Sequence, residues 1–201
     1  MSAHINAPDG GVSDGGEPDG PASGPNAAAG GRLAKTVALV GLMGVGKSTV
    51  GRKLADSLGA AFIDSDDEIE KAAGLSVQEI FDRLGEPEFR RGERRVIERL
   101  LNGPPIVLAT GGGAFMDEGT RALMKEKATT VWLRADLDVI WKRVNRRDTR
   151  PLLKRANPKQ ALADLNTARA PVYAEADIVV DSGDGPAAEA VKAIREKLGF
   201  A

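Results

Sequence analysis

The chain has 201 residues, with 28 basic and 29 acidic side chains and a formal net charge of −1, which fits one domain or one domain with an appendage. It contains no cysteine, which excludes disulfides, thiolate metal sites and thiol catalysis and makes the cytoplasm the expected location. No apolar run approaches the roughly 18 residues of a membrane span, and the N-terminus lacks the pattern of a signal peptide, so no membrane partner is expected.

Residues 1–34 are rich in Gly, Pro, Ala, Ser and Asp and show almost no apolar periodicity. Such a segment buries too little apolar surface to offset the entropy lost on ordering. We therefore predict a disordered extension over residues 1–34 and a single folded domain over residues 35–201. The one histidine, His4, lies in the extension, so proton transfer in the domain must use carboxylates, lysine, tyrosine or water.

The extension carries acidic residues but no Lys or Arg before residue 32, which leaves the domain mildly basic. Arginines cluster in residues 90–95 and 143–150, a pattern that suits an anionic ligand. A solvated helix face or a nucleic-acid surface is the competing interpretation. Interleaved glutamates and the lack of stacking aromatic side chains argue against nucleic acid, so no nucleic-acid partner is expected.

An apolar run at residues 37–40 breaks into glycines and resumes at helical spacing. Between the two, residues 41–48 (GLMGVGKS) fit the phosphate-loop pattern G-x-x-x-x-G-K-[ST]. The backbone N–H groups of such a loop surround a phosphate, and the next helix adds the positive end of its dipole. We expect Lys47 to reach the β- and γ-phosphates and Ser48 to offer its hydroxyl to Mg²⁺. The residues expected around the phosphates are Gly44, Val45, Gly46, Lys47, Ser48 and Thr49.

The rest of the chain alternates short apolar strands with helices, which predicts an α/β fold with a parallel sheet and helices on both faces. The expected strands cover residues 37–40, 60–63, 106–109, 130–133 and 177–180. The expected helices cover about residues 50–58, 69–73, 76–84, 88–101, 117–127, 136–144, 158–174 and 186–198. Between helices, residues 145–157 are charged and broken by Pro151, which predicts a mobile loop.

Two aspartates, Asp64 and Asp66, follow the second strand, at the edge where ligands bind in open α/β sheets. Ser65 and Glu68 have the form of a capping box, so capping of the next helix is the alternative for this segment. We favour a functional role for the two aspartates, because a Mg²⁺-nucleotide site needs a carboxylate and the strand at 106–109 lacks the usual one.

Two further features are candidates for a functional role. The apolar stripe of residues 88–101 places Glu93 on the inward side, where a carboxylate needs a partner. Arg90 lies three residues earlier on the same face, so we expect Glu93 to orient its guanidinium, while Arg91, Arg94 and Arg95 are expected to form surface ion pairs. Residues 111–113 are three glycines after a strand, which fits either a flexible turn or, as we prefer, a backbone that a substrate approaches closely.

Taken together, the sequence closely resembles the bacterial shikimate kinases over residues 36–200. The matching segments, in the same order, are 41–48 (GLMGVGKS), 62–66 (FIDSD), 88–93 (EFRRGE), 111–113 (GGG), 149–153 (TRPLL) and 169–173 (RAPVY). Six such motifs are far more specific than a phosphate loop alone. The resemblance implies a P-loop, nucleoside-monophosphate-kinase-like fold with a five-stranded parallel sheet, a substrate-binding insertion at about 65–101 and a lid at about 145–157.

The resemblance also implies ATP-dependent phosphorylation of the 3-hydroxyl of shikimate, giving shikimate 3-phosphate and ADP, in the route to chorismate and aromatic amino acids. It implies that Asp66 binds the shikimate hydroxyls and can accept the proton, and that Arg90 and Arg169 hold the carboxylate. The backbone of Gly111, Gly112 and Gly113 is implied to contact the substrate.

On the nucleotide side, the resemblance implies that Arg150 reaches the phosphates from the lid and, with Lys47 and Asp66, is catalytic. Arg143 is implied to lie against the adenine, with Pro186 on its other side. Asp64 is implied to support Mg²⁺ together with Ser48. The expected partners are shikimate and ATP or ADP, bound by a monomer.

Two alternatives stay open at this point. Phosphoryl transfer needs positioning and charge stabilisation more than a nucleophile, so a domain without histidine or cysteine can catalyse it. A kinase for gluconate or a similar small acid could use the same phosphate loop. The pair of arginines with the two aspartates favours a rigid cyclic carboxylate instead. A regulatory module could bind nucleotide without turnover, but the joint presence of Asp66, Arg90, Arg150 and Arg169 argues against it.

Overall fold

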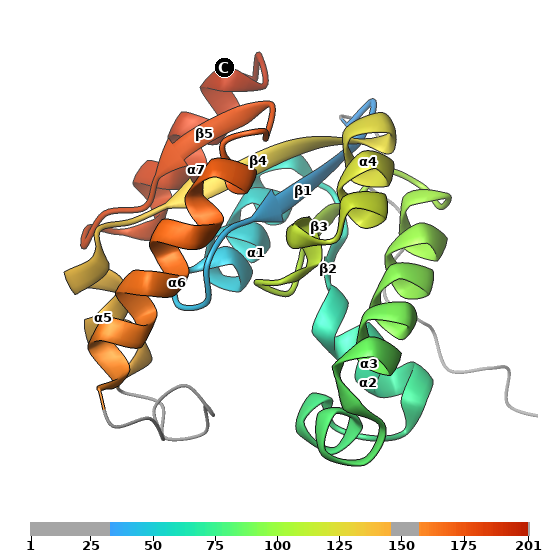
Figure 1. The fold of residues 1–201 in the computed structure, drawn as a ribbon. Coiled ribbons are helices and arrows are strands. Elements are labelled where there is room, and N and C mark those ends of the chain that lie inside the picture. The colour runs from blue at the N-terminus through green and yellow to red at the C-terminus, as the bar shows by residue number, and fades with distance from the viewer. Residues whose placement is uncertain (1–32, 146–156, 201) are drawn as a thin grey trace, which may run out of the picture.

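The computed structural model describes residues 33–145 and 157–200, in which five parallel strands form one sheet with helices on both faces (Figure 1). The strand order is β2 (Phe62–Asp64), β3 (Val107–Ala109), β1 (Thr36–Val40), β4 (Ala128–Arg134) and β5 (Ile178–Asp181). In the register, Ala38 of β1 lies opposite Leu108 on one side and Thr130 on the other. From β1 the chain crosses to the edge strand β2, returns to β3 beside β1, and then adds β4 and β5 on the other side. The carboxyl end of β1 is therefore the switch point where α/β sheets bind ligands.

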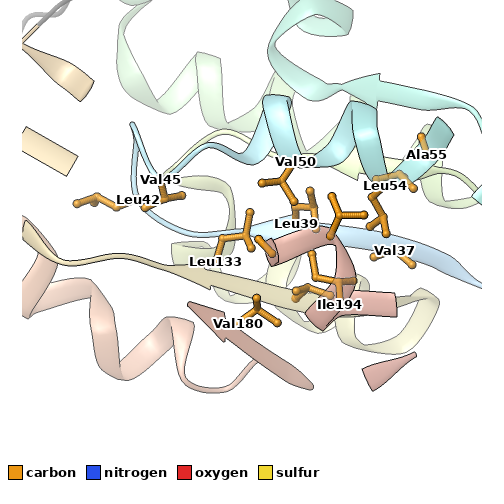
Figure 2. Packing of buried hydrophobic residues seen from close by; sticks show 14 of the residues in the cluster. Val37, Leu39, Leu42, Val45, Val50, Leu54, Ala55, Leu133, Val180 and Ile194 are labelled. Carbon is orange, nitrogen blue, oxygen red and sulfur yellow. The ribbon is translucent and has the colours of Figure 1, made fainter. Parts of the chain in front are cut away.

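Alternating side chains of the central strand enter two separate cores. Val37 and Leu39 pack with α1 (Lys47–Leu58) and α7 (Ala187–Lys197) in the first core, part of which Figure 2 shows. Ala38 and Val40 pack in the second core. The helices and the short 3₁₀ segment that contribute to that core are α3 (Val77–Leu101), η1 (Ala114–Met116), α4 (Glu118–Lys127) and α6 (Pro158–Tyr173). The period of two along a strand therefore gives the predicted arrangement of helices on both faces.

The remaining helices complete the fold. α5 (Leu137–Val144) follows β4, and α2 (Ser65–Ala73) packs with α3 around a small third core of Ile69, Ile80, Phe89 and Val96. In Figure 1, α2 and the first part of α3 lie away from the sheet, whereas the end of α3 returns to it and packs in the second core. The long helix α3 is broken at Gly85, whose φ of 81° and ψ of 168° are not helical, as the sequence predicted.

One local prediction is wrong. The helix expected at about 69–73 begins at Ser65, and its N-cap is Asp64, whose side chain accepts a hydrogen bond from the Asp66 N–H at 3.1 Å. Ser65 and Glu68 therefore form no capping box, because β2 runs directly into the helix and leaves Asp64 as the last extended residue. Ser65 instead lies inside the helix, where its hydroxyl accepts from the Gly111 N–H at 3.1 Å.

The predicted disordered extension, except for its last two residues, and nearly all of the predicted lid, with Arg150, lie outside the described residues. Within the described part of the chain, no helix has the length and apolar character needed to cross a membrane.

Candidate active site

The phosphate loop joins the carboxyl end of β1 to the first turn of α1. Gly44 in this loop has a φ of 81°, and a Cβ there would lie 2.5 Å from a Val144 methyl group, so no other residue fits without displacement. Lys47 is 9% exposed and donates from Nζ to the carbonyl oxygens of Gly41 at 2.7 Å and Leu42 at 3.0 Å. The loop therefore holds the Lys47 side chain against its own backbone. Lys47 is the first residue of α1, where the helix dipole is positive.

Ser48 and Asp64 lie side by side beyond the loop. The Ser48 hydroxyl donates to Asp64 Oδ2 at 2.7 Å, and Ser48 is exposed. Among the described residues, no group of three or more His, Asp or Glu side chains could enclose a metal ion. A hydroxyl and one carboxylate nevertheless fit Mg²⁺, which usually takes one or two protein ligands beside phosphate oxygens and water.

Asp66 and Glu93 come from different helices and face the same glycine. Asp66 Oδ1 and Glu93 Oε1 are buried without a hydrogen-bond partner, and a Cβ on Gly111 would lie 2.9 Å and 2.8 Å from them. Burial raises the pKa of the Asp66 carboxyl from its ordinary value of 3.8 to about 6, with Asp64 adding to the rise and Lys47 opposing it. Burial also raises the pKa of Glu93, against the opposing charge of Arg90. A side chain at position 111 would therefore collide with both carboxylates.

Arg90 is oriented from its own helix. Its Nη1 donates to Glu93 Oε2 at 2.6 Å, and its Nη2 lies 3.2 Å from Glu86 Oε1. Because Glu93 is 2% exposed, this ion pair is fixed in the protein interior, as the sequence predicted. A Cβ at Gly113 would collide with the Arg90 guanidinium, so the glycine turn also lies directly against this arginine.

Arg169 reaches the same turn from the opposite side. Its Nη1 donates to the Gly112 carbonyl oxygen at 2.9 Å, and the Tyr173 hydroxyl donates to the same oxygen. A Cβ on Gly112 would lie 3.3 Å from the Met43 N–H nitrogen, which places the turn against the phosphate loop. Asp66, Arg90 and Arg169, although far apart in sequence, thus converge beside the loop expected to hold phosphate.

The residues expected near the adenine lie behind the phosphate loop. Arg143 donates from Nη1 to the Val45 carbonyl oxygen at 3.2 Å and from Nη2 to the Gly183 carbonyl oxygen at 2.5 Å. Pro186 is exposed and is the N-cap of α7, shortly after Gly183. Arg143 therefore joins the loop to the segment that leads to Pro186, and their contact with adenine stays a prediction.

The sequence analysis missed three contributors to this site. Ser182 is 6% exposed and donates to the Val45 carbonyl oxygen at 2.9 Å, next to Arg143. Ser65 holds the Gly111 N–H, and Tyr173 holds the Gly112 carbonyl. Ser65 and Tyr173 lie inside motifs shared with the family, and this was the only indication in the sequence that they belong to the site. The sequence does not show which backbone group a hydroxyl will contact.

The family model and the curated relatives give one family. A sequence model of the family described as shikimate kinase matches residues 43–199. A shikimate kinase from Caulobacter vibrioides is 59% identical over 165 residues, which cover 82% of this chain and 82% of that protein. One from Paramagnetospirillum magneticum is 58% identical over 154 residues, covering 77% and 79% of the two chains.

Solved structures give the same result for the fold. The structure of a shikimate kinase from Acinetobacter baumannii in complex with shikimate is 39% identical to this chain and covers 82% of it and 93% of its own chain, with a TM-score of 0.78. Because the family model spans most of the sequence and the identities to its members are high, the chain belongs to the shikimate kinase family of ATP-dependent kinases.

Proposed function

We propose that this protein transfers the γ-phosphoryl group of ATP to the 3-hydroxyl of shikimate through the residues that converge on Gly111, Gly112 and Gly113. The observation that carries the proposal is this convergence: one half-buried aspartate and two arginines surround a glycine turn that packs on a phosphate loop. Family membership supports the same reaction.

The acceptor is held, in this proposal, through its carboxylate and its hydroxyls. Arg90 and Arg169 offer planar guanidinium groups, which suit a carboxylate. Glu93 keeps Arg90 in one orientation, and the Gly112 carbonyl does the same for Arg169. Asp66 Oδ1, which has no other partner in the protein, accepts a hydrogen bond from a shikimate hydroxyl.

The chemical step requires one proton acceptor. As the 3-hydroxyl oxygen bonds to the γ-phosphorus, the bond from that phosphorus to the β–γ bridging oxygen breaks, ADP leaves, and the hydroxyl proton passes to Asp66. A pKa of about 6 suits this task, because Asp66 is mostly ionised near neutral pH yet is a stronger base than an ordinary aspartate.

The phosphates are held by the loop. The N–H groups of residues 44–49 surround the phosphate oxygens, Lys47 exchanges its internal carbonyl partners for the β- and γ-phosphates, and Arg143 lies toward the adenine with Pro186. Arg150, outside the described residues, is proposed to reach the transferring phosphate from the lid. Mg²⁺, held by Ser48 and Asp64, would neutralise charge on the phosphate oxygens.

The proposal includes a monomer in the cytoplasm that binds neither nucleic acid nor a membrane. Its support is that both substrates are small anions and that every proposed contact comes from a single chain. A sedimentation measurement of the purified protein tests the monomer.

A coupled assay of ADP release tests the function. The purified protein is given ATP and Mg²⁺ with shikimate, with gluconate, or with no acceptor. We expect turnover with shikimate only, with shikimate 3-phosphate as the product. Equal or faster turnover with gluconate would support the small-acid kinase instead, and nucleotide binding without turnover on any acceptor would support a regulatory module.

A further inference from the structure

Tyr173 ends α6 with its phenol ring buried in the second core. The residue is 1% exposed, and its ring stacks on Trp132 of β4 with a centroid distance of 5.9 Å and an interplanar angle of 26°. Its hydroxyl donates to the Gly112 carbonyl oxygen, which also accepts from Arg169 Nη1. Because a carbonyl oxygen has two lone pairs, these two donors together fix its direction.

The same peptide separates the two arginines proposed to hold the carboxylate. On one side, Arg169 bonds to the Gly112 oxygen, and on the other, Gly113 lies directly against the Arg90 guanidinium. The C=O of Gly112 and the N–H of Gly113 point from opposite edges of one planar unit. Rotation of this peptide would therefore move the carbonyl partner of Arg169 relative to Arg90, which Glu93 and Glu86 hold from α3.

We infer that Tyr173 is a positioning residue that sets the separation of the Arg90 and Arg169 guanidinium groups by holding the Gly112 carbonyl. Arg169 uses only Nη1 for this carbonyl and keeps other N–H donors for a carboxylate, and Tyr173 supplies the second donor that holds the carbonyl in place. Tyr173 lies one helical turn after Arg169 on the same face of α6, and the stack on Trp132 keeps its hydroxyl in place. The inference rests on the proposed function, in which both arginines bind the shikimate carboxylate.

The first test is Tyr173→Phe, which keeps the stacked ring and removes only the hydroxyl. The Gly112 carbonyl keeps Arg169 as a donor, so no buried group is left without a partner. We expect the KM for shikimate to rise about three- to tenfold, as for the loss of one hydrogen bond, with the KM for ATP unchanged. An unchanged KM for shikimate, or equal rises in both KM values, would overturn the inference.

Thr130→Val is the matched control, because it removes another fully buried hydroxyl, one that bonds to Asp177 Oδ2 at 2.7 Å away from the glycine turn. It should lower the melting temperature without changing either KM. A rise in the KM for shikimate equal to that of Tyr173→Phe would show that general loss of stability explains both variants, and would refute the positioning role.

A double-mutant cycle separates this inference from the proposed function. If Tyr173 and Arg169 act on one carbonyl, the effects of Tyr173→Phe and Arg169→Lys on shikimate binding should not add. Additive effects would overturn the inference while leaving the proposed function intact. If Arg169→Lys itself had no effect on shikimate binding, the carboxylate assignment in the proposed function would fail instead.

Tyr173 is the single tyrosine of the chain, so its ionisation can be followed by ultraviolet absorbance in the unaltered enzyme. Burial raises the pKa of its phenol, and the charge of Arg169 opposes the rise. A carboxylate bound to Arg169 would cancel part of that opposition, so saturating shikimate should raise the pKa further. Titration at alkaline pH values where the enzyme stays folded checks this, and an unchanged or lowered pKa would contradict the binding of a carboxylate at Arg169, on which the inference rests.

Discussion

The two halves of the site satisfy their polar groups in different ways. On the nucleotide side, Lys47 bonds to two carbonyls of its own loop and Ser48 bonds to Asp64. On the acceptor side, by contrast, Asp66 and Glu93 each keep one buried oxygen without a partner in the protein. In the proposed function, a nucleotide therefore replaces bonds that Lys47 and Ser48 already make, whereas an acceptor hydroxyl supplies a bond that the Asp66 oxygen lacks. This contrast predicts that binding energy at the acceptor side depends strongly on single side chains.

The largest expected effect is that of Asp66→Asn on turnover. The variant keeps the size of the side chain but cannot take the hydroxyl proton, so kcat should fall by about 10²-fold or more, with a smaller change in the KM for shikimate. Steady-state kinetics with the coupled assay measure both constants. The KM for ATP serves as the control, because the nucleotide side should be unaffected. A kcat within a few-fold of the unaltered enzyme would exclude Asp66 as the proton acceptor.

The acidic limb of the pH profile is the next largest effect. Since burial raises the pKa of Asp66 to about 6, the free enzyme should lose the ionised form as the pH falls through that value. The kcat/KM for shikimate should then decrease about tenfold per pH unit below it. Nucleotide binding without acceptor should show no such limb. An acidic limb centred near pH 4 would mean that Asp66 is not desolvated in the working enzyme.

A substitution of Arg90 tests whether shikimate binding needs the planar pair of guanidinium donors or only the positive charge. Arg90→Lys keeps the positive charge but loses the planar pair of donors that Glu93 orients, so the KM for shikimate should rise about tenfold. Arg94→Lys is the control from the same helix, where the sequence predicts only surface pairing. Calorimetric titration should find ATP binding unchanged in both. Unaltered shikimate binding by Arg90→Lys would remove Arg90 from the acceptor site.

The same contrast explains what the sequence could predict. The phosphate loop is contiguous, so one pattern over residues 41–48 contains all its parts, and the alternation of strands and helices predicted the sheet. The convergence of Asp66, Arg90 and Arg169 depends on the order of the strands, and only resemblance to a family indicated it. The roles of Tyr173 and Ser182 could not be found, because each bonds to a backbone carbonyl more than 60 residues away in the chain.

The smallest predicted effect is on stability: Asp66→Asn should make the protein more stable although it lowers activity. Ionised Asp66 is disfavoured in the folded protein, because its pKa is about 6 there against an ordinary value of 3.8. This cost to stability is fully present above pH 6 and disappears as the pH falls below about 4. Asp66→Asn should therefore raise the melting temperature by a few degrees at pH 7.5, and the difference should vanish near pH 4.

Asp64 provides the matched comparison, two residues away on the nucleotide side of the contrast. Its carboxylate caps α2 and accepts from the Ser48 hydroxyl, so both of its oxygens have partners. Asp64→Ala should lower the melting temperature at pH 7.5, since a lost N-cap typically costs about 1 kcal/mol. If Asp66→Asn also lowered the melting temperature, the ionised Asp66 carboxylate would not be destabilising the folded protein. The acceptor side would then be as fully satisfied as the nucleotide side, and the contrast between them would fail.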